Sequence, residues 1–291
     1  LALSLLDKKY NVIGIDNFLT GKKEKLPHKS YRNFKFFFGD VNNKNKISDI
    51  FRSYKIQYVF HFAAVVGVQR TQQFPLKVMN DMNGTKNLLD LSVKYKIKRF
   101  FYSSSSEVYG EPVTLPLQEE NSPLNSRLPY SIVKNVSENY VKIFQEEYNL
   151  NYTIFRFFNT FGPNQSEDFV IPKFVKLALK NLSIPIYGDG LQTRTFLYID
   201  DNIDTIVNCF EKNLYINDIL NIGSNTEYKI IDLAKKIIKL TNSSSKFKYL
   251  PALPRGDMKR RQPDNSKMKK ALGKKFFNLN LALQKYIDYL K

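Results

Sequence analysis

The segment YSIVKN, residues 130–135, contains the side chains best suited to chemistry, because its tyrosine stands four places before its lysine. Residues four apart share one face of a helix, so Tyr130 and Lys134 are expected to project together. A neighbouring cation favours the phenolate and lowers the pKa of a tyrosine from about 10. A phenolate of this kind can remove a proton from a sugar hydroxyl near neutral pH. We therefore predict that Tyr130 is a catalytic base with a lowered pKa.

The segment SSSSEVYG, residues 103–110, supplies hydroxyl groups that could act beside this base. It follows an apolar run typical of a buried strand, and a serine at the strand end could hydrogen-bond the same substrate oxygen. We take Ser105 as that serine and assign no role to its neighbours. The segment also contains Glu107, which is either a catalytic acid or a structural hydrogen-bond acceptor.

The elements that carry these residues alternate between strands and helices along the chain. The strand-like runs are almost continuously apolar, which is typical of parallel strands buried on both faces. The sequence therefore predicts an α/β fold with a doubly wound parallel sheet that helices cover on both sides. The runs are NVIGID, FKFFFGD, YVFHFAAV, KRFFYSSS and YTIFRFFN, with helical stretches at NGTKNLLDLSVKYK and YSIVKNVSENYVKIFQEEY.

The rhythm of strands and helices changes after residue 160, where turns and short helical runs follow one another. We expect residues 1–160, with part of 195–225 returning to them, to form the domain built on the sheet. Residues 161–194 and 226–291 are expected to form a smaller C-terminal lobe. The chain opens inside a helical run, LALSLLDKKY, that no capping residue precedes, so we expect the element leading into it to be missing from this sequence.

Composition favours a globular chain and leaves more than one interpretation of its charge. With 291 residues, of which 43% are hydrophobic, the chain can bury a large core. The formal net charge of +18 fits a lysine-rich solvated surface, a field that attracts a nucleotide diphosphate, or a non-enzymatic basic module that binds RNA. The lysines are spread along the chain, which favours the first two interpretations and predicts no nucleic-acid partner.

Some classes of protein are disfavoured by the residues that the sequence lacks. Cys209 is the single cysteine, so no internal disulfide can form, and two histidines are too few for a zinc-type cluster. No run approaches the roughly 18 apolar residues of a membrane span, and the first residues do not resemble a signal peptide. We therefore expect no metal, no membrane partner and a cytoplasmic location.

Further candidate binding residues follow the strand-like runs, because ligands of open α/β sheets bind at the carboxyl ends of the strands. Asp16 ends one run at the position where a carboxylate would hold the adenosine ribose of a dinucleotide. Asp40 and Val41 end the next run, where a carboxylate and a backbone group could meet an adenine edge. The small residues of HFAAVVG would let a flat cofactor approach the backbone.

These motifs together resemble the extended short-chain dehydrogenase/reductase superfamily, in its branch of NAD-dependent nucleotide-sugar epimerases and dehydratases. The resemblance covers nearly the whole chain and is nearest to the UDP-glucose 4-epimerases. It implies a Rossmann-like NAD-binding domain and a smaller substrate-binding lobe. The matching stretches, in family order, are VIGIDNFLTG, GDV, HFAAVVGV, NGTKNLL, SSSSEVYGEP, PYSIVK, RFFNTFGPNQ, YGDGLQTRTFLYIDD and LNIGS.

The resemblance also implies a role for individual residues. Ser105, Tyr130 and Lys134 match the catalytic hydroxyl, base and lysine, and the lysine also holds the nicotinamide ribose. The other implied NAD contacts are Asp16 and Asn17 at the adenosine ribose, Asp40 and Val41 at the adenine, Phe62, Ala63 and Ala64 beneath the cofactor, and Phe158 near the nicotinamide. The implied substrate contacts are Ser105, Asn159, Tyr187 near the base, Arg194 on the diphosphate, and Arg255, Asp257 and Arg261 in a loop over the nucleotide.

Several positions depart from the family pattern. The glycine-rich turn that binds the cofactor pyrophosphate is absent because the sequence starts after it, so we expect an N-terminally truncated chain that binds NAD poorly. Asp81 stands where many relatives have asparagine, Val66 where some galactose-type epimerases have lysine, and Phe169 where an asparagine contacts the nucleotide. These differences leave the sugar and the base of the substrate open.

The reaction that the resemblance implies most directly is C4 epimerisation of a UDP-sugar through a 4-keto intermediate, with no second substrate. Glu107 keeps open a nucleotide-sugar 4,6-dehydratase or a UDP-glucuronate decarboxylase, because those enzymes have an acidic residue in this segment. A homodimer is expected as well, since relatives usually pair through the helix that carries the tyrosine and the helix after NGTK.

Overall fold

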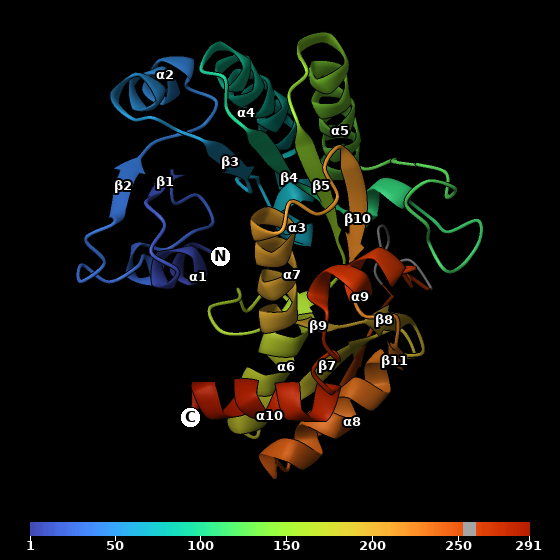
Figure 1. Cartoon of the computed structure of the whole chain (residues 1–291). Helices are drawn as coiled ribbons and strands as arrows, with labels where there is room; N and C mark the ends of the chain where they lie inside the picture. The colour runs from blue at the N-terminus through green and yellow to red at the C-terminus, as the bar shows by residue number, and fades with distance from the viewer. Residues whose placement is uncertain (253–259) are drawn as a thin grey trace. The chain divides into compact units, whose positions relative to one another are not determined.

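The computed structural model describes residues 1–252 and 260–291, which fold into two compact units (Figure 1). Each unit combines segments that are far apart in the sequence. The first unit consists of Leu1–Gly110, Leu124–Arg156 and Ile206–Leu220, and the second of Glu111–Pro123, Phe157–Thr205 and Asn221–Lys291.

Strands and helices alternate through the first unit, which confirms the predicted α/β class. Every strand predicted from an apolar run is present. The elements are α1 (Ala2–Asp7), β1 (Val12–Asp16), η1 (Lys23–Lys25), β2 (Phe34–Phe38), α2 (Lys44–Ser53), β3 (Tyr58–His61), α3 (Val68–Gln73), α4 (Pro75–Lys94), β4 (Arg99–Ser105), η2 (Ser106–Tyr109), α5 (Pro129–Tyr148) and β5 (Tyr152–Phe157). Later in the chain, the unit also includes α7 (Ile199–Glu211) from Ile206 onward and β10 (Asp218–Ile222) up to Leu220.

The strands of this unit form a four-stranded sheet in the order β10-β5-β4-β3 and a separate pair, β1-β2. The β1-β2 and β3-β4 pairs are parallel, as predicted. Val12 lies opposite Phe34 in the first pair, and Tyr58 lies opposite Arg99 in the second. In a parallel arrangement the carboxyl ends of neighbouring strands lie at one edge. The residues that follow β3 and β4 are therefore close in space.

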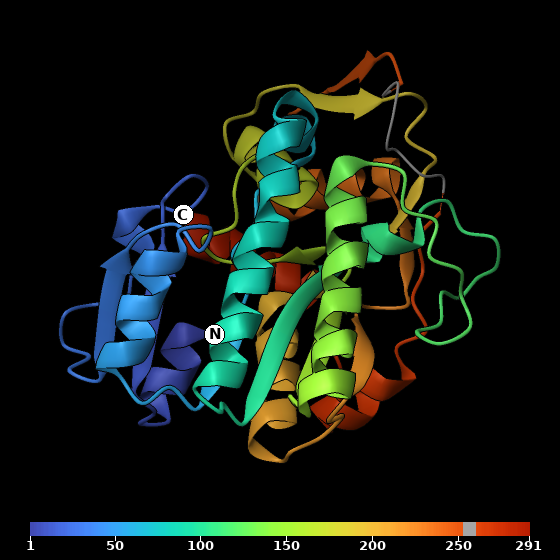
Figure 2. The same cartoon turned by 90° about the horizontal axis from the view of Figure 1, so that it is seen from above.

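Helices cover both faces of the four-stranded sheet. Alternate residues of β4 point to opposite faces, so their contacts show which helices lie on each side. Phe100 and Tyr102 belong to a buried cluster with side chains of α2, α4 and α5, and Figure 2 shows α4 and α5 side by side over the sheet. On the other face, the Phe101 ring lies 4.4 Å from that of Phe60 and 6.1 Å from that of Phe210 in α7. The sheet is thus buried on both sides, which explains its apolar strands.

Two long helices position the candidate catalytic residues. Helix α5 begins at Pro129, because proline has a suitable fixed φ and needs no hydrogen-bond partner in the first turn. Helix α4 begins at Pro75 for the same reason, eight residues before the helical stretch predicted from residue 83. Within α4, a Cβ at Gly84 would lie 2.7 Å from the Val41 side chain, so only glycine allows this close approach.

The second unit has its own core, in which helices pack on short strands. Ile171, Val175, Leu233, Ile237 and Leu283 are among its buried side chains. The elements are β6 (Thr160–Phe161), α6 (Val170–Leu179), β7 (Ile184–Tyr187), β8 (Thr193–Thr195), β9 (Leu197–Tyr198), β11 (Glu227–Lys229), α8 (Ile230–Thr241), β12 (Phe247–Leu250), α9 (Ser266–Leu272) and α10 (Leu279–Leu290).

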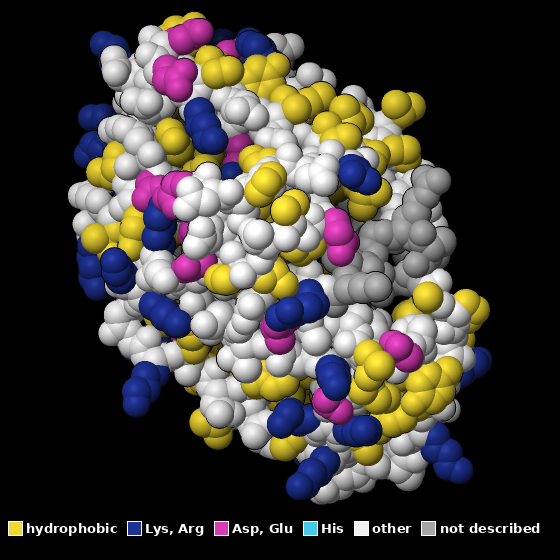
Figure 3. Space-filling model, turned by 90° about the vertical axis from the view of Figure 1, so that its right-hand side faces the viewer, with side chains coloured by type: hydrophobic (Ala, Val, Ile, Leu, Met, Phe, Trp, Pro, Cys, Tyr) yellow, Lys and Arg dark blue, Asp and Glu magenta, His cyan; other side chains and the backbone are white. Residues whose placement is uncertain are grey.

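Lysine and arginine side chains are dispersed among acidic and neutral ones on the molecular face drawn in Figure 3. Searching the described residues for a helix both apolar and long enough to cross a bilayer finds none.

Candidate active site

Helix α5 directs Tyr130 and Lys134 from the same face, as their spacing predicted. Its first turn is fixed by the hydroxyl of Ser131, which accepts a hydrogen bond from the amide of Leu128 at 3.2 Å and donates to the Leu128 carbonyl at 2.9 Å. The tyrosine is half-buried and the lysine is only 3% exposed. The helix start therefore places a half-buried phenol and, one turn further along the helix, a buried amine.

The hydroxyl of Ser105 lies against this phenol. Ser105 is the last residue of β4, and its hydroxyl lies close enough to the Tyr130 phenol to lower the pKa of that phenol, while it accepts from the amide of Glu107 at 3.2 Å. The chain turns into η2 directly after this serine, which leaves its hydroxyl at the strand end. The structure thus brings together the serine and the tyrosine that the sequence selected.

The amine of Lys134 is hydrogen-bonded to the backbone of β4. Its Nζ donates to the carbonyl oxygen of Ser103 at 2.6 Å and lies 5.0 Å from the centre of the Tyr102 ring. Burial lowers the pKa of Lys134 to about 8, although the carboxylates of Asp81 and Glu138 raise it. The amine is therefore half-protonated near pH 8.

The prediction that Tyr130 has a lowered pKa is wrong for the polypeptide by itself. Burial raises the pKa of Tyr130, and the charges of Glu107 and Asp81 raise it further, while the hydrogen bond from Ser105 lowers it. The Lys134 amine does not reverse this, because it is bound to the strand and lies 5.7 Å from the centre of the Tyr130 ring. Without a further positive charge, the phenol keeps its proton at neutral pH.

Asp81 is a site residue that the sequence indicated only as a departure from the family pattern. It lies on α4, and its carboxylate accepts a hydrogen bond from the amide of Val65 at 2.8 Å. This bond fixes the segment after β3. Burial raises the pKa of Asp81, and the charge of Lys134 opposes that rise. The site therefore contains an ionisable carboxylate at a position where many relatives have an uncharged asparagine.

The residues predicted to hold the adenosine end of NAD lie after β1 and β2. Asp16 is exposed, and its Oδ1 accepts from the amide of Phe18 at 2.6 Å. The Asn17 side chain donates to Asp40 Oδ2 at 2.9 Å, and Asp40 Oδ1 accepts from the Asn42 amide at 2.8 Å. The turn after β1 and the turn after β2 are thereby tied together. A carboxylate at an open strand end offers the acceptor oxygens that ribose hydroxyls require.

The strip predicted to lie beneath the cofactor follows β3. This strand ends at His61, so Phe62, Ala63 and Ala64 lie outside the ladder, although the apolar run YVFHFAAV had been expected to continue as a strand. The Phe62 ring lies 6.2 Å from that of Phe60. Phe62, Ala63 and Ala64 therefore follow the carboxyl end of β3, at the sheet edge where β4 also ends.

Five predicted residues lie among the described residues of the second unit. Phe158 is buried, and its amide donates to Ile222 at 2.9 Å. The other four are Asn159, which donates to the Thr195 carbonyl at 3.3 Å, Tyr187 at the end of β7, Arg194 on β8, which donates to the Thr193 carbonyl at 2.7 Å, and the buried Arg261. Arg255 and Asp257 lie outside the described residues.

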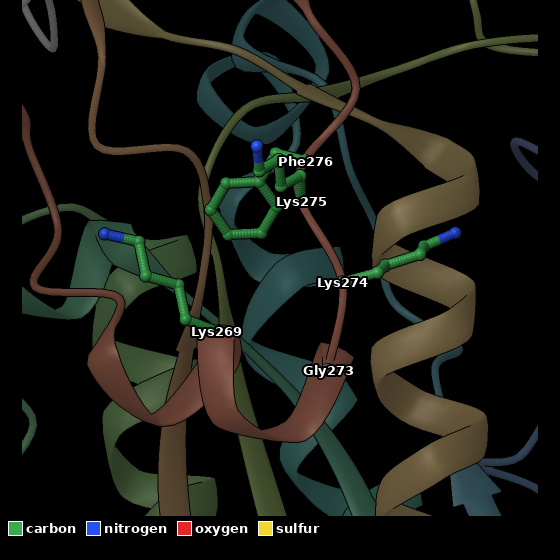
Figure 4. A pocket seen from close by; sticks show the side chains of 5 residues that line it. All are labelled: Lys269, Gly273, Lys274, Lys275 and Phe276. Atoms are coloured by element: carbon green, nitrogen blue, oxygen red, sulfur yellow. The ribbon is translucent and has the colours of Figure 1, made fainter.

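A hollow of about 560 Å³ in the second unit does not include any of these predicted residues. Figure 4 shows its lining at the end of α9, where Lys269 and Lys275 flank Phe276. The Lys274 side chain turns away from them toward α7, and it pairs with Asp204 at 2.5 Å. This hollow is therefore separate from the candidate active site.

Comparison with known proteins gives consistent matches. Residues 1–223 match the family model described as "NAD dependent epimerase/dehydratase family". The chain is 32% identical over 283 residues to a UDP-N-acetyl-alpha-D-glucosaminuronate decarboxylase of Bacillus cytotoxicus, which covers 92% of this chain and 86% of that protein. It is also 32% identical over 261 residues to the dTDP-D-glucose 4,6-dehydratase of Homo sapiens, with coverage of 86% and 74%.

The fold has similar solved structures as well. The crystal structure of UDP-glucose 4-epimerase with UDP-glucose from Thermotoga maritima aligns with a TM-score of 0.93 and 30% identity, over 99% of this chain and 93% of that one. Proteins named for three different reactions thus match the chain at nearly equal identity.

Proposed function

The chain belongs to the NAD-dependent epimerase/dehydratase family, and on that premise we propose that it is a nucleotide-sugar epimerase that inverts C4 of a UDP-sugar. The observation that supports this most is the contact between Ser105 and Tyr130 at the end of β4, with Lys134 one turn behind. The resemblance inferred from the motifs is confirmed at the level of family and fold.

The residues at the ends of β1 and β2 fit the adenosine end of NAD by their chemistry, whereas the glycine-rich turn expected at the pyrophosphate is not part of this sequence. Asp16, Asn17 and Asp40 would hold the adenosine end through carboxylate and amide groups at adjoining strand ends, and Lys134 would hold the nicotinamide ribose. When bound, oxidised NAD supplies a reversible hydride acceptor and a positive charge on its nicotinamide ring.

The polypeptide supplies the proton transfer. Tyr130 removes the proton of the sugar hydroxyl as the sugar is oxidised and returns it when the sugar is reduced. Ser105 donates to the same oxygen and orients it. Lys134 is mostly protonated below its pKa of about 8, but its charge alone does not make Tyr130 a phenolate, so a further positive charge beside the phenol is needed for this step. No further acid is required, because the proton that Tyr130 removes during oxidation is the one it returns during reduction.

We propose that the second unit binds the nucleotide through Asn159, Tyr187 and cationic side chains. Arg194 is suited to the diphosphate, because a planar guanidinium can donate two parallel hydrogen bonds to an anionic group. The relative from Thermotoga maritima was solved with UDP-glucose, which supports a UDP-sugar as substrate. Arg255, Asp257 and Arg261 would contact the same nucleotide.

A dehydratase or decarboxylase is the second candidate, and Glu107 is the residue that favours it. This half-buried carboxylate follows Ser105 by two residues, and its charge acts on the Tyr130 phenol. A group so close to the base could remove a second proton from the oxidised sugar, which elimination of water requires. The decarboxylase and dehydratase relatives support this alternative equally.

Identification of the product decides between the two. The protein is incubated with NAD and, in separate reactions, UDP-glucose, UDP-N-acetylglucosamine, dTDP-glucose and UDP-glucuronate, and the products are identified by NMR. A C4 epimer supports the proposal. A 4-keto-6-deoxy sugar or released carbon dioxide refutes it in favour of the second candidate.

Two variants separate the roles of the side chains. Tyr130→Phe should reduce turnover by about 100-fold or more while NAD still binds, because only the proton acceptor is removed. Glu107→Gln should retain epimerase turnover within a few-fold, whereas a dehydratase should lose most of its activity.

We also propose a homodimer formed through α4 and α5. Both helices present exposed apolar side chains, including Leu76 on α4 and Val136 and Ile143 on α5. Light scattering after gel filtration should give twice the mass of 34.0 kDa, and Val136→Asp with Ile143→Asp should give the monomer. A cytoplasmic location remains a prediction.

A further inference from the structure

Helix α5 contacts the end of β4 a third time, one turn beyond the lysine. Glu138 follows Lys134 by four residues and so lies on the same face as Lys134 and Tyr130. Its Oε1 accepts a hydrogen bond from the hydroxyl of Ser104. Three side chains of one helix face are therefore matched to three consecutive residues of the strand that carries the candidate catalytic serine.

Arg156 of β5 completes this contact. Its Nε donates to Glu138 Oε1 at 3.0 Å and its Nη2 donates to Glu138 Oε2 at 2.7 Å, which is the paired geometry of guanidinium and carboxylate. Its Nη1 donates to the hydroxyl of Tyr109 at 2.9 Å, and the guanidinium lies 4.9 Å from the centre of that ring. One ion pair thus joins α5, β4, β5 and η2.

A gain in folding stability does not explain why this buried ion pair is present. Glu138 is 0% exposed and Arg156 is 1% exposed, so both charges are removed from water. The desolvation of a buried ion pair often cancels its Coulombic attraction, and apolar residues of similar volume can be equally stable. Burial opposes the charge of Arg156, but its hydrogen bonds to Glu138 raise its pKa, so the arginine stays protonated. Compared with apolar side chains of similar volume, the charged pair adds a contact with a fixed direction between the helix and the strands.

We propose that Glu138 and Arg156 are a positioning pair that fixes α5 against the end of β4 and thereby places Tyr130 at Ser105. The pair acts through these elements and not on the substrate, since Glu138 is about 12 Å along the helix from Tyr130. The inference rests on the proposed function, in which Tyr130 and Ser105 act on the same oxygen. A rotation or shift of α5 by about 1 Å would separate them, and misplacement of that size can cost about 100-fold in rate.

Glu138 also acts on the amine of Lys134, which lies one turn before it on the same face of α5. The charged groups that act on Lys134 are Asp81 from α4 and Glu138 from its own helix, and both raise its pKa. The neighbouring side chains from the strands, His61 and Tyr102, are uncharged at neutral pH because burial lowers the pKa of the first and raises that of the second. Removal of the Glu138 charge should therefore lower the pKa of Lys134.

The first test compares stability with turnover. The double variant Glu138→Leu with Arg156→Met replaces the pair by apolar side chains and should remain folded. We expect its kcat to fall by about 10- to 100-fold, with KM changed less than about threefold, because positioning of the reacting groups is lost while binding is kept. A folded double variant with wild-type kcat overturns the proposal.

A milder variant tests the same contact should the double variant not fold. Ser104→Ala removes one hydrogen bond to Glu138 and leaves the ion pair, and it should lower kcat several-fold. Ser92→Ala is its matched control, because Ser92 is equally buried and its hydroxyl donates to the Leu88 carbonyl at 2.6 Å, within α4. An equal loss of kcat in both variants, or none in Ser104→Ala, contradicts a positioning role.

The second test needs no substrate and so separates this inference from the proposed reaction. The titration of Lys134 is followed by NMR of lysine ¹³Cε, with the signal assigned from Lys134→Met. We expect a midpoint near pH 8 in the wild type and a lower one in Glu138→Gln. An unchanged midpoint overturns the inference. The expected shift in a protein that turns over no nucleotide sugar refutes the reaction instead and leaves the pair in place.

Discussion

Replacement of Lys134 by methionine should change how the stability of the protein depends on pH. The amine is 3% exposed, and burial lowers its pKa from 10.5 to about 8. The folded state therefore binds fewer protons than the unfolded state between pH 8 and 10.5, so the free energy of unfolding rises with pH in that window. Below pH 8 the cost of burying the charged amine is present in full.

The expected magnitude follows from the two pKa values. They differ by about 2.5 pH units, and each unit corresponds to about 1.4 kcal/mol, so the cost is about 3 kcal/mol. Lys134→Met has no titrating group at this position. The free energy of unfolding of the wild type minus that of the variant should therefore increase by about 3 kcal/mol from pH 7 to pH 10.5.

Urea unfolding followed by circular dichroism at several pH values measures this difference. The other ionisable side chains are common to both proteins, so their contributions cancel in the comparison. Lys142→Met, two turns farther along α5 and more exposed, is the matched control for the loss of one lysine. A difference between wild type and Lys134→Met that stays constant from pH 7 to pH 10.5 would refute the argument.

Three further predictions concern buried groups. Burial and then the charge of Lys134 lower the pKa of His61 to about 3, so its ring should keep constant NMR shifts from pH 5 to 8, and a transition near pH 6 would contradict this. Burial raises the pKa of Cys209 to about 12, so Ellman's reagent at pH 8 should modify it only after unfolding; rapid reaction of the native protein would show the thiol to be accessible. Gly84→Ala should destabilise the protein by about 1–3 kcal/mol in urea unfolding because of the clash with Val41, and wild-type stability would mean that α4 can shift.

Much of the fold could be predicted because its signals are local. Continuous apolar runs marked the buried strands, and Pro129 with the four-residue spacing of Tyr130 and Lys134 marked the start of α5 and its working face. The limits were also local. An apolar run does not show where a strand leaves its ladder, so the end of β3 at His61 was missed.

The electrostatics of the site could not be predicted, because they depend on contacts between distant parts of the chain. The pKa of Tyr130 reflects its burial and the carboxylate of Asp81, which reaches it from another helix. The ion pair of Glu138 with Arg156 joins a helix to a strand. Only one clue was available in advance: Glu138 continues the spacing of four that begins at Tyr130.

That spacing has a consequence for how the sequence can change in length. Each residue of an α-helix turns the chain by about 100°, so one residue inserted between Tyr130 and Glu138 would rotate the later contacts away from the strand. Length changes in the connection between η2 and α5 do not alter this rotation. Insertions and deletions among natural or engineered variants should therefore collect in that connection and avoid the first three turns of α5.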